Sequence, residues 1–277
     1  MPELPEVEVT KLGIEPYVVG QAVSHLIIHD GRLRWPVPSH LKTTLQGQLC
    51  QAIHRRGKYL LFQFEHGVLI IHLGMTGVLR IQHRHEVPKK HDRVEIVFDE
   101  FSLRLHDPRK FGAIWWHPRS QGPVEQLPML ARLGLEPLEA NFAGQLGGKH
   151  LHQASRGRTI AIKQFLLAGH AVVGVGNIYC SESLFEARIN PKTAAGKISE
   201  GRYMILAESI RKILLRAIAA GGSSLKDFVN SHGEPGHFMM QTQAYDRANL
   251  PCTICQRPIK QIKQTGRSTF YCATCQK

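Results

Sequence analysis

The sequence has no apolar run long enough to cross a bilayer, for which roughly 18–20 residues are needed. No basic segment followed by an apolar one opens the chain, so we expect no secretory signal peptide. Acidic residues are scarce, since 22 Asp and Glu stand against 35 Lys and Arg, and the net charge is +13. These absences predict a cytoplasmic protein with a polyanionic partner, nucleic acid first and an anionic membrane surface as the alternative.

Cysteines are few and unevenly placed, which argues against a secreted disulfide scaffold in a chain of 277 residues. Four of the six fall in the last 26 residues, as two Cys-x-x-Cys pairs that enclose sixteen residues. Two such pairs supply four thiolates for a structural zinc site with no open position for catalysis; the plainer alternative is two chance pairs in a reduced tail. We therefore expect one structural Zn²⁺ and no redox or nucleotide cofactor. The expected ligands are Cys252, Cys255, Cys272 and Cys275, while Cys50 and Cys180 are expected in the core.

Residues 22–117 contain short apolar runs separated by turn residues, a pattern typical of strands. Several short strands in succession favour a sandwich or barrel, with a helix that starts at Pro5 packed on it. Residues 118–135 are rich in Pro, Gly and Gln and are predicted to be a linker. The expected strands are 22–28, 58–64, 68–73, 93–98 and 101–105.

After this linker the periodicity becomes helical, and helices are predicted over 141–152, 159–168, 177–187 and 200–220. Two glycines precede the third helix, but a third glycine and a βαβ context are missing, so a dinucleotide site is rejected. A glycine-rich turn before a helix still offers backbone N–H groups to a phosphate. The last helix is the clearest, with Tyr203, Leu206, Ile210, Ile213, Leu214 and Ala217 on one face.

The first residues, Met1-Pro2-Glu3, place a proline where removal of the initiator methionine exposes a secondary amine. An α-amino group titrates near ~8, so part of it is neutral and nucleophilic at physiological pH. Attack on an aldehyde-like carbon gives an iminium ion, an electron sink that promotes elimination, and Glu3 adjoins it as a proton donor. The alternative is an N-cap followed by an ordinary surface helix.

Three stretches that are unusually polar for strand ends carry candidate functional residues. Lys58 follows two arginines and a glycine, and belongs either to an exposed turn or to an active site or phosphate contact. Met75 lies in a glycine-flanked turn, where it is either a core residue or a wedge that enters a base step of DNA. Arg109 and Phe111 stand two apart in a turn and offer a cation and an apolar plane.

Taken in order, these motifs resemble the formamidopyrimidine-DNA glycosylase family, bacterial repair enzymes that remove oxidised purines such as 8-oxoguanine. The resemblance covers essentially the whole chain, with motifs at 2–9, 55–60, 72–77, 106–112, 158–187 and 252–277. It implies a bifunctional glycosylase and abasic-site lyase of the bacterial cytosol. It also implies an α+β multidomain fold with an N-terminal β-sandwich, a helix-two-turns-helix domain and a zinc-finger β-hairpin. The expected partner is damaged double-stranded DNA, bound by a monomer.

The resemblance assigns catalytic roles to four residues. Pro2 attacks the sugar and forms a Schiff base, and Glu3 helps to open the sugar by protonating it. Lys58 matches the lysine of the β-elimination step, and Arg267 matches the arginine of δ-elimination and phosphate contact.

The resemblance also implies how DNA is held. A base flipped out of the duplex leaves a gap, which Met75, Arg109 and Phe111 are expected to fill. The expected contacts to the DNA are His91, Arg109, Arg158 and Asn177, with Lys163 as a weaker candidate.

The implied domains are a catalytic domain (1–118), a linker (119–135), a DNA-binding domain (136–224), a lesion-capping region (225–246) and a zinc finger (247–277). Three residues depart from the family pattern: His232 and His237 replace an aspartate and a tyrosine, and Ala168 replaces an acidic residue. We expect these departures to affect closure of the capping region and lesion preference, and to leave the catalytic positions unchanged.

Two other functions stay open on the sequence alone. An endonuclease-eight-like enzyme that acts on oxidised pyrimidines shares the nucleophile, the helical domain and the finger, although residues 4–8 and the gap-filling set favour the purine branch. A non-catalytic zinc-finger regulator fits the charge and the finger, but it leaves Pro2-Glu3 and the gap-filling residues without a role. Activity on a lesion-containing duplex separates these possibilities.

Overall fold

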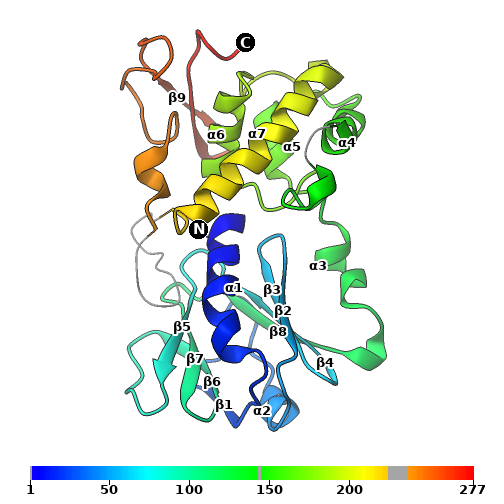
Figure 1. The fold of residues 1–277 in the computed structure, drawn as a ribbon, viewed down its shortest axis with the longest axis vertical. Coiled ribbons are helices and arrows are strands. Elements are labelled where there is room, and N and C mark those ends of the chain that lie inside the picture. The colour runs from blue at the N-terminus through cyan, green and yellow to red at the C-terminus, as the bar shows by residue number, and fades with distance from the viewer. Residues whose placement is uncertain (1, 143–144, 224–235) are drawn as a thin grey trace. The chain divides into compact units, whose positions relative to one another are not determined.

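The computed structural model describes residues 2–142, 145–223 and 236–277 (Figure 1). They group into two compact units, of which the first takes in Met1–Ala131 and Ala220–His237, and the second Arg132–Ala219 and Phe238–Lys277. Among these described residues, no helix combines the length and the apolar character needed to cross a membrane.

The first unit is built on two four-stranded antiparallel sheets. One has the order β1 (His25–Ile28), β6 (Asp92–Val97), β7 (Phe101–His106), β5 (Val78–His83). The other has the order β2 (Ala52–Arg56), β3 (Tyr59–Gln63), β4 (Gly67–His72), β8 (Ala113–Pro118). Apolar side chains of both sheets share one core, which confirms the predicted sandwich. They include Leu26, Ile96 and Leu103 from the first sheet and Phe62, Leu69 and Ile71 from the second.

Helix α1 (Leu4–Val18) packs on this core, as predicted, and it carries proline in its first turn, where that residue favours the start of a helix. Glu3 is its N-cap residue, and the backbone N–H of Glu3 donates to Glu6 Oε2 at 2.8 Å. Val7, Ile14 and Val18 bury its inner face. A short helix α2 (Leu41–Leu45) adds two further buried leucines.

The five predicted strands are present as β1, β3, β4, β6 and β7, whereas β2, β5 and β8 were not predicted. The three missed strands carry polar, basic or tryptophan residues on a half-exposed face, and they exist because a neighbouring strand pairs with them. Much of the predicted linker is also ordered into short turns of helix. These are η1 (Arg119–Gln121), η2 (Val124–Gln126) and α3 (Pro128–Ala131).

The second unit contains the predicted helices as α4 (Gln145–Ser155), α5 (Ile162–Leu167), α6 (Asn177–Glu186) and α7 (Glu200–Ala219). The predicted apolar face of α7 is entirely buried, and α7 packs against α4 and α6. Three short 3-10 turns complete the helical part. They are η3 (Ala140–Phe142), η4 (Ala195–Lys197) and η5 (Phe238–Gln241).

The zinc-finger hairpin is formed by β9 (Lys260–Gln264) and β10 (Arg267–Tyr271). Thr265 and Gly266 join them with φ of 44° and 78°, the backbone that a two-residue hairpin turn requires. Phe270 of β10 shares a small apolar cluster with Phe185 of α6, so the hairpin packs on the helical part of the same unit. The three-part α+β architecture expected from the resemblance is confirmed.

Candidate functional site

The candidate residues of the first unit gather where several strands begin or end. β4 ends at His72, which pairs with Ala113 at the start of β8. β7 ends at His106, which pairs with both Val78 of β5 and Asp92 of β6. The loops 73–77 and 107–112 connect these strand ends and therefore lie at the same end of the sandwich.

Asp107 fastens the two loops to each other. This fully buried carboxylate accepts hydrogen bonds from Thr76 Oγ1 at 2.7 Å and from the Gly112 backbone N–H at 2.7 Å. Gly74 has φ +65°, and a Cβ atom placed there would lie 2.3 Å from the carbonyl carbon and oxygen of Phe111. The backbones of the two loops are thus in direct contact.

The expected gap-filling residues project from these fastened loops. Met75 and Phe111 are 39% and 43% exposed, so Met75 is not a core residue. The Arg109 guanidinium lies over the Phe111 ring, 4.8 Å from its centroid. Together with His72 and neighbouring residues they line a hollow of about 650 Å³. An apolar surface and a cation therefore share one exposed edge, as insertion between DNA bases requires.

His72 lines the same hollow and was not proposed as a site residue from the sequence. Burial, and then the positive charges of Lys58 and Arg34, lower its pKa to about 4, so the ring is neutral at physiological pH. The Gly74 N–H donates to His72 Nδ1 at 3.0 Å, which leaves the proton on Nε2. His72 could have been found from the sequence, because it is a polar residue at the end of a predicted strand and opens the motif 72–77.

Lys58 lies in the two-residue turn between β2 and β3, and its side chain is half-buried. Arg55 anchors this turn to α1, because its Nε donates to Glu8 Oε2 at 2.5 Å and its Nη1 to the Gly57 carbonyl at 3.0 Å. Burial raises the pKa of Glu8, but pairing with Arg55 and Lys11 outweighs burial and lowers it overall. The turn that carries Lys58 is thus fixed to the helix that begins beside Pro2.

Pro2 and Glu3 are buried at the start of α1. Glu6 holds this end, since one carboxylate oxygen accepts the Glu3 N–H and the other accepts the backbone N–H and hydroxyl of Ser223, at 2.7 and 2.8 Å. Met1 lies outside the described residues. The positive end of α1 faces this terminus, which favours a neutral amine there.

His91 immediately precedes β6 and is half-buried, with the unusual φ of +80°. Its carbonyl accepts the Asp107 N–H at 3.0 Å, and its Nδ1 lies 3.0 Å from Arg93 Nη2. The structure therefore places His91 beside the loop that carries Arg109 and Phe111.

In the second unit, Arg267 is exposed directly after the hairpin turn. The carbonyl of the next residue, Ser268, accepts from Lys163 Nζ at 2.8 Å and from Asn177 Nδ2 at 3.1 Å. Lys163 is only 1% exposed and also donates to Thr269 Oγ1 at 2.9 Å. Lys163 thus supports the hairpin from inside, and half-buried Asn177 joins α6 to it.

Arg158 is exposed in the turn between α4 and α5. Ala168 is the C-cap residue of α5, and His237 is exposed, with its N–H donating to the Ala220 carbonyl at 2.9 Å. His232 and the first half of the expected capping region, 225–235, lie outside the described residues. The effect of these departures stays a prediction.

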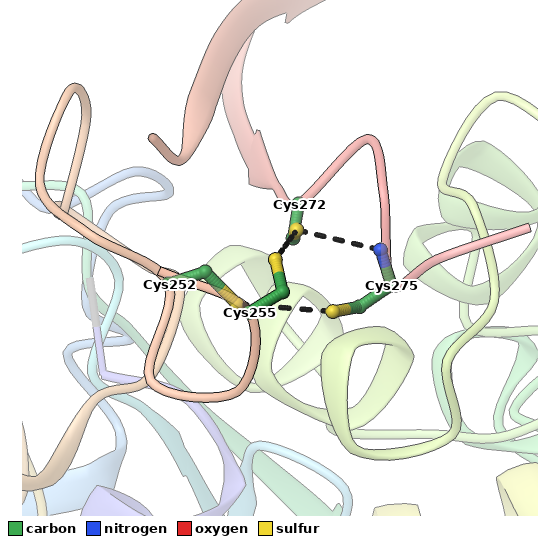
Figure 2. A group of neighbouring side chains, drawn as sticks. All are labelled: Cys252, Cys255, Cys272 and Cys275. Atoms are coloured by element: carbon green, nitrogen blue, oxygen red, sulfur yellow. Dashed lines mark hydrogen bonds between the residues drawn. The ribbon is translucent and has the colours of Figure 1, made fainter. Parts of the chain in front are cut away.

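The four tail cysteines form one cluster, with all four Sγ atoms within 4.8 Å of one another (Figure 2). The Cys252–Cys275 and Cys255–Cys272 Sγ pairs are 4.0 and 3.5 Å apart. Tetrahedral zinc with Zn–S bonds of about 2.3 Å requires sulfur separations of about 3.8 Å. The cluster therefore fits one structural Zn²⁺, as predicted, while Cys50 and Cys180 are buried elsewhere.

Family models match almost the whole chain. The formamidopyrimidine-DNA glycosylase N-terminal domain matches residues 1–114, the H2TH domain of the same family matches 133–229, and a zinc finger found in FPG and IleRS matches 249–277. A protein of Polynucleobacter necessarius named formamidopyrimidine-DNA glycosylase is 59% identical over 277 residues, which is 100% of both chains.

Solved structures of a Lactococcus lactis protein, Fpg (MutM), show the same fold. Its complex with DNA containing N7-benzyl-Fapy-dG has a TM-score of 0.89 and 33% identity over 100% of both chains. Its complex with DNA containing an oxidised pyrimidine has a TM-score of 0.88 and 33% identity over the same coverage.

Proposed function

This chain belongs to the formamidopyrimidine-DNA glycosylase family, and we propose that it excises oxidised purines from duplex DNA through a Schiff base on Pro2. The observation that carries the proposal is the start of α1, where Pro2 and Glu3 stand at the positive end of a helix held by Glu6. The enzyme is a base-excision-repair glycosylase with the abasic-site lyase activity of its family.

The chemistry requires the free amine of Pro2, which forms when Met1 is removed. Its nitrogen attacks C1′ of the damaged nucleoside, the bond from C1′ to the base breaks, and Glu3 protonates the sugar oxygen as the ring opens. The resulting iminium withdraws electrons, so that loss of the C2′ proton expels the 3′ phosphate. A second elimination expels the 5′ phosphate, and hydrolysis of the imine frees Pro2.

Lys58 and Arg267 are assigned to these eliminations. Lys58 sits in a turn that the Arg55–Glu8 pair fixes to α1, which supports a constant distance from the N-terminal amine. Arg267 is exposed at the tip of the zinc-finger hairpin, where a guanidinium can bind a phosphate with two hydrogen bonds.

Duplex binding is assigned to cations and to the gap-filling set. Met75, Arg109 and Phe111 occupy the space of the flipped nucleotide, which offsets part of the few kcal/mol that flipping costs. His91, Arg158 and Asn177 contact the sugar-phosphate backbone. With a net charge of +13, affinity should fall steeply as salt rises.

We further propose the domain limits 1–118, 119–135, 136–224, 225–246 and 247–277 for catalysis, linkage, DNA binding, lesion capping and the zinc finger. A protein that acts on chromosomal DNA works in the bacterial cytosol, and we propose that location for this chain.

Borohydride trapping on an 8-oxoguanine duplex tests the function. The wild type should be trapped covalently and Pro2→Gly should be trapped far less, because glycine lacks the ring that fixes the terminal nitrogen and its imine, unlike the iminium of a secondary amine, is not permanently charged. Glu3→Gln is the matched control: it keeps the secondary amine and should still be trapped on an abasic duplex. Normal trapping of Pro2→Gly, with Met1 shown to be absent, would contradict the role assigned to the secondary amine of Pro2.

A second substrate class follows from the Lactococcus lactis complex with an oxidised pyrimidine. The same trapping experiment on a duplex with an oxidised pyrimidine measures it. Adduct on the pyrimidine alone would move this chain to the pyrimidine branch.

A further inference from the structure

Arg93, in β6, is a buried side chain that joins three segments at one end of the sandwich. Only 7% of the residue is exposed. Its Nη1 donates to Asp30 Oδ2 at 3.1 Å, its Nε to the Asp107 carbonyl at 2.9 Å, and its Nη2 lies 3.0 Å from His91 Nδ1. One guanidinium therefore ties the loop after β1, the residue before β6 and the loop that carries Arg109.

The contact with His91 fixes the proton of that ring. A guanidinium carries only donors, so Nδ1 of His91 must accept the hydrogen bond from Arg93. A neutral imidazole that accepts at Nδ1 bears its single proton on Nε2, the other ring nitrogen. The backbone of His91, held at φ +80° by the hydrogen bond from Asp107, sets where this Nε2–H points.

We propose that Arg93 is a positioning residue that keeps His91 a neutral imidazole and directs its Nε2–H to a DNA phosphate. The inference rests on the DNA contact proposed above for His91 and adds the protonation state and tautomer of its ring. His91 thereby binds phosphate as a hydrogen-bond donor and not as a cation. Because a protonated Nδ1 could not accept from Arg93, we expect the contribution of His91 to be the same at pH 8 and at pH 6.

The charged groups around His91 act in the same direction. Partial burial lowers the pKa of His91, and Arg93 of β6, the adjacent Lys90, His106 at the end of β7 and Lys110 of the following loop lower it further. The carboxylate of the next residue in the chain, Asp92 of β6, lies 2.9 Å from His106 Nδ1. Among the described residues His91 has no ion pair with a carboxylate that would favour its charged form.

Long-range ¹⁵N NMR of the histidine rings in the full-length, zinc-loaded protein tests the proposal without DNA. The His91 signal is assigned by its loss in His91→Gln. In the wild type, Nδ1 should be unprotonated and Nε2 protonated from pH 8 to pH 6. In Arg93→Met the ring should show both tautomers and its pKa should rise, because the donor to Nδ1 and one of the positive charges that lower the pKa are gone.

Arg32→Met is the matched control, because Arg32 pairs with the same Asp30 at 2.8 Å while its side chain is 82% exposed. It should leave the His91 signals unchanged. Should Arg93→Met fail to fold, Arg93→Lys keeps the positive charge but cannot bridge all three segments. Protonated Nδ1 in the wild type, or an Arg93 variant with unaltered His91 signals, overturns the proposal.

Affinity for a duplex with a tetrahydrofuran abasic analogue tests the phosphate contact. His91→Gln should weaken binding about fivefold, equally at pH 6 and pH 8, which is the worth of one ordinary hydrogen bond. In the Arg93→Met background the same substitution should weaken binding more at pH 6 than at pH 8, because without the Arg93 guanidinium some of the His91 rings become charged at the lower pH. A pH-dependent effect in the wild-type background overturns the neutral donor. If trapping on Pro2 is normal and His91→Gln binds like the wild type at both pH values, the phosphate contact fails and the proposed catalytic function stands.

Discussion

Gly74→Ala tests whether the contact between the loops 73–77 and 107–112 positions the gap-filling residues. An alanine Cβ would lie 2.3 Å from the carbonyl of Phe111, whereas a normal carbon contact is about 3.5–4 Å. The Phe111 backbone must therefore retreat by about 1 Å. A misplacement of that size can cost about 100-fold in rate, so we expect single-turnover excision of 8-oxoguanine to fall by that factor.

Gly20→Ala is the matched control. Gly20 has φ +82°, so alanine there suffers the same left-handed backbone cost of about 1–2 kcal/mol, but no atom lies within 4 Å of the added Cβ. The clash alone should make Gly74→Ala about 1–3 kcal/mol less stable than Gly20→Ala in urea unfolding. Trapping on an abasic duplex, where no base has to be flipped, should fall much less than excision. Equal excision rates for the two variants would refute the assignment of this contact to lesion engagement.

Two further predictions concern the anchors of the site. Pairing lowers the pKa of Glu8 below its ordinary 4.5, so its carboxylate stabilises the fold above that pH and the benefit disappears as the pH falls through the lowered value. In urea unfolding, Glu8→Gln should therefore have an unfolding free energy about 1–3 kcal/mol lower than the wild type at pH 7. The difference should shrink progressively below pH 4.5. A difference independent of pH would contradict the ion pair. Cys255→Ser or chelation of zinc should lower the affinity for DNA, measured by fluorescence anisotropy. After chelation, the affinity should recover when Zn²⁺ is returned. An undiminished affinity would argue against the finger as a DNA contact.

Patterns in the sequence predicted the features that depend on residues near one another in the chain. The apolar face of α7 follows from helical periodicity, and the cysteine cluster follows from spacing, because both involve residues near one another in the chain. Arg93 could not be found this way, since its partners Asp30 and Asp107 are 63 and 14 positions away and only strand pairing brings them together. The same holds for β2, β5 and β8, whose polar faces hide the strand pattern until a neighbour pairs with them.

Three of the places proposed to touch DNA share a structural feature, in that a buried polar side chain holds either the backbone or the side chain there. Asp107 holds the loop of Arg109 and Phe111, Arg93 holds His91, and within the second unit Lys163 binds the carbonyl that follows Arg267. An exposed side chain on an anchored backbone loses less conformational entropy on binding, so more of its contact energy remains as affinity. Buried polar anchors cost desolvation and are retained only where their hydrogen bonds are satisfied. At these three places the anchors have hydrogen-bond partners, as positioning of the neighbouring side chains for DNA would require.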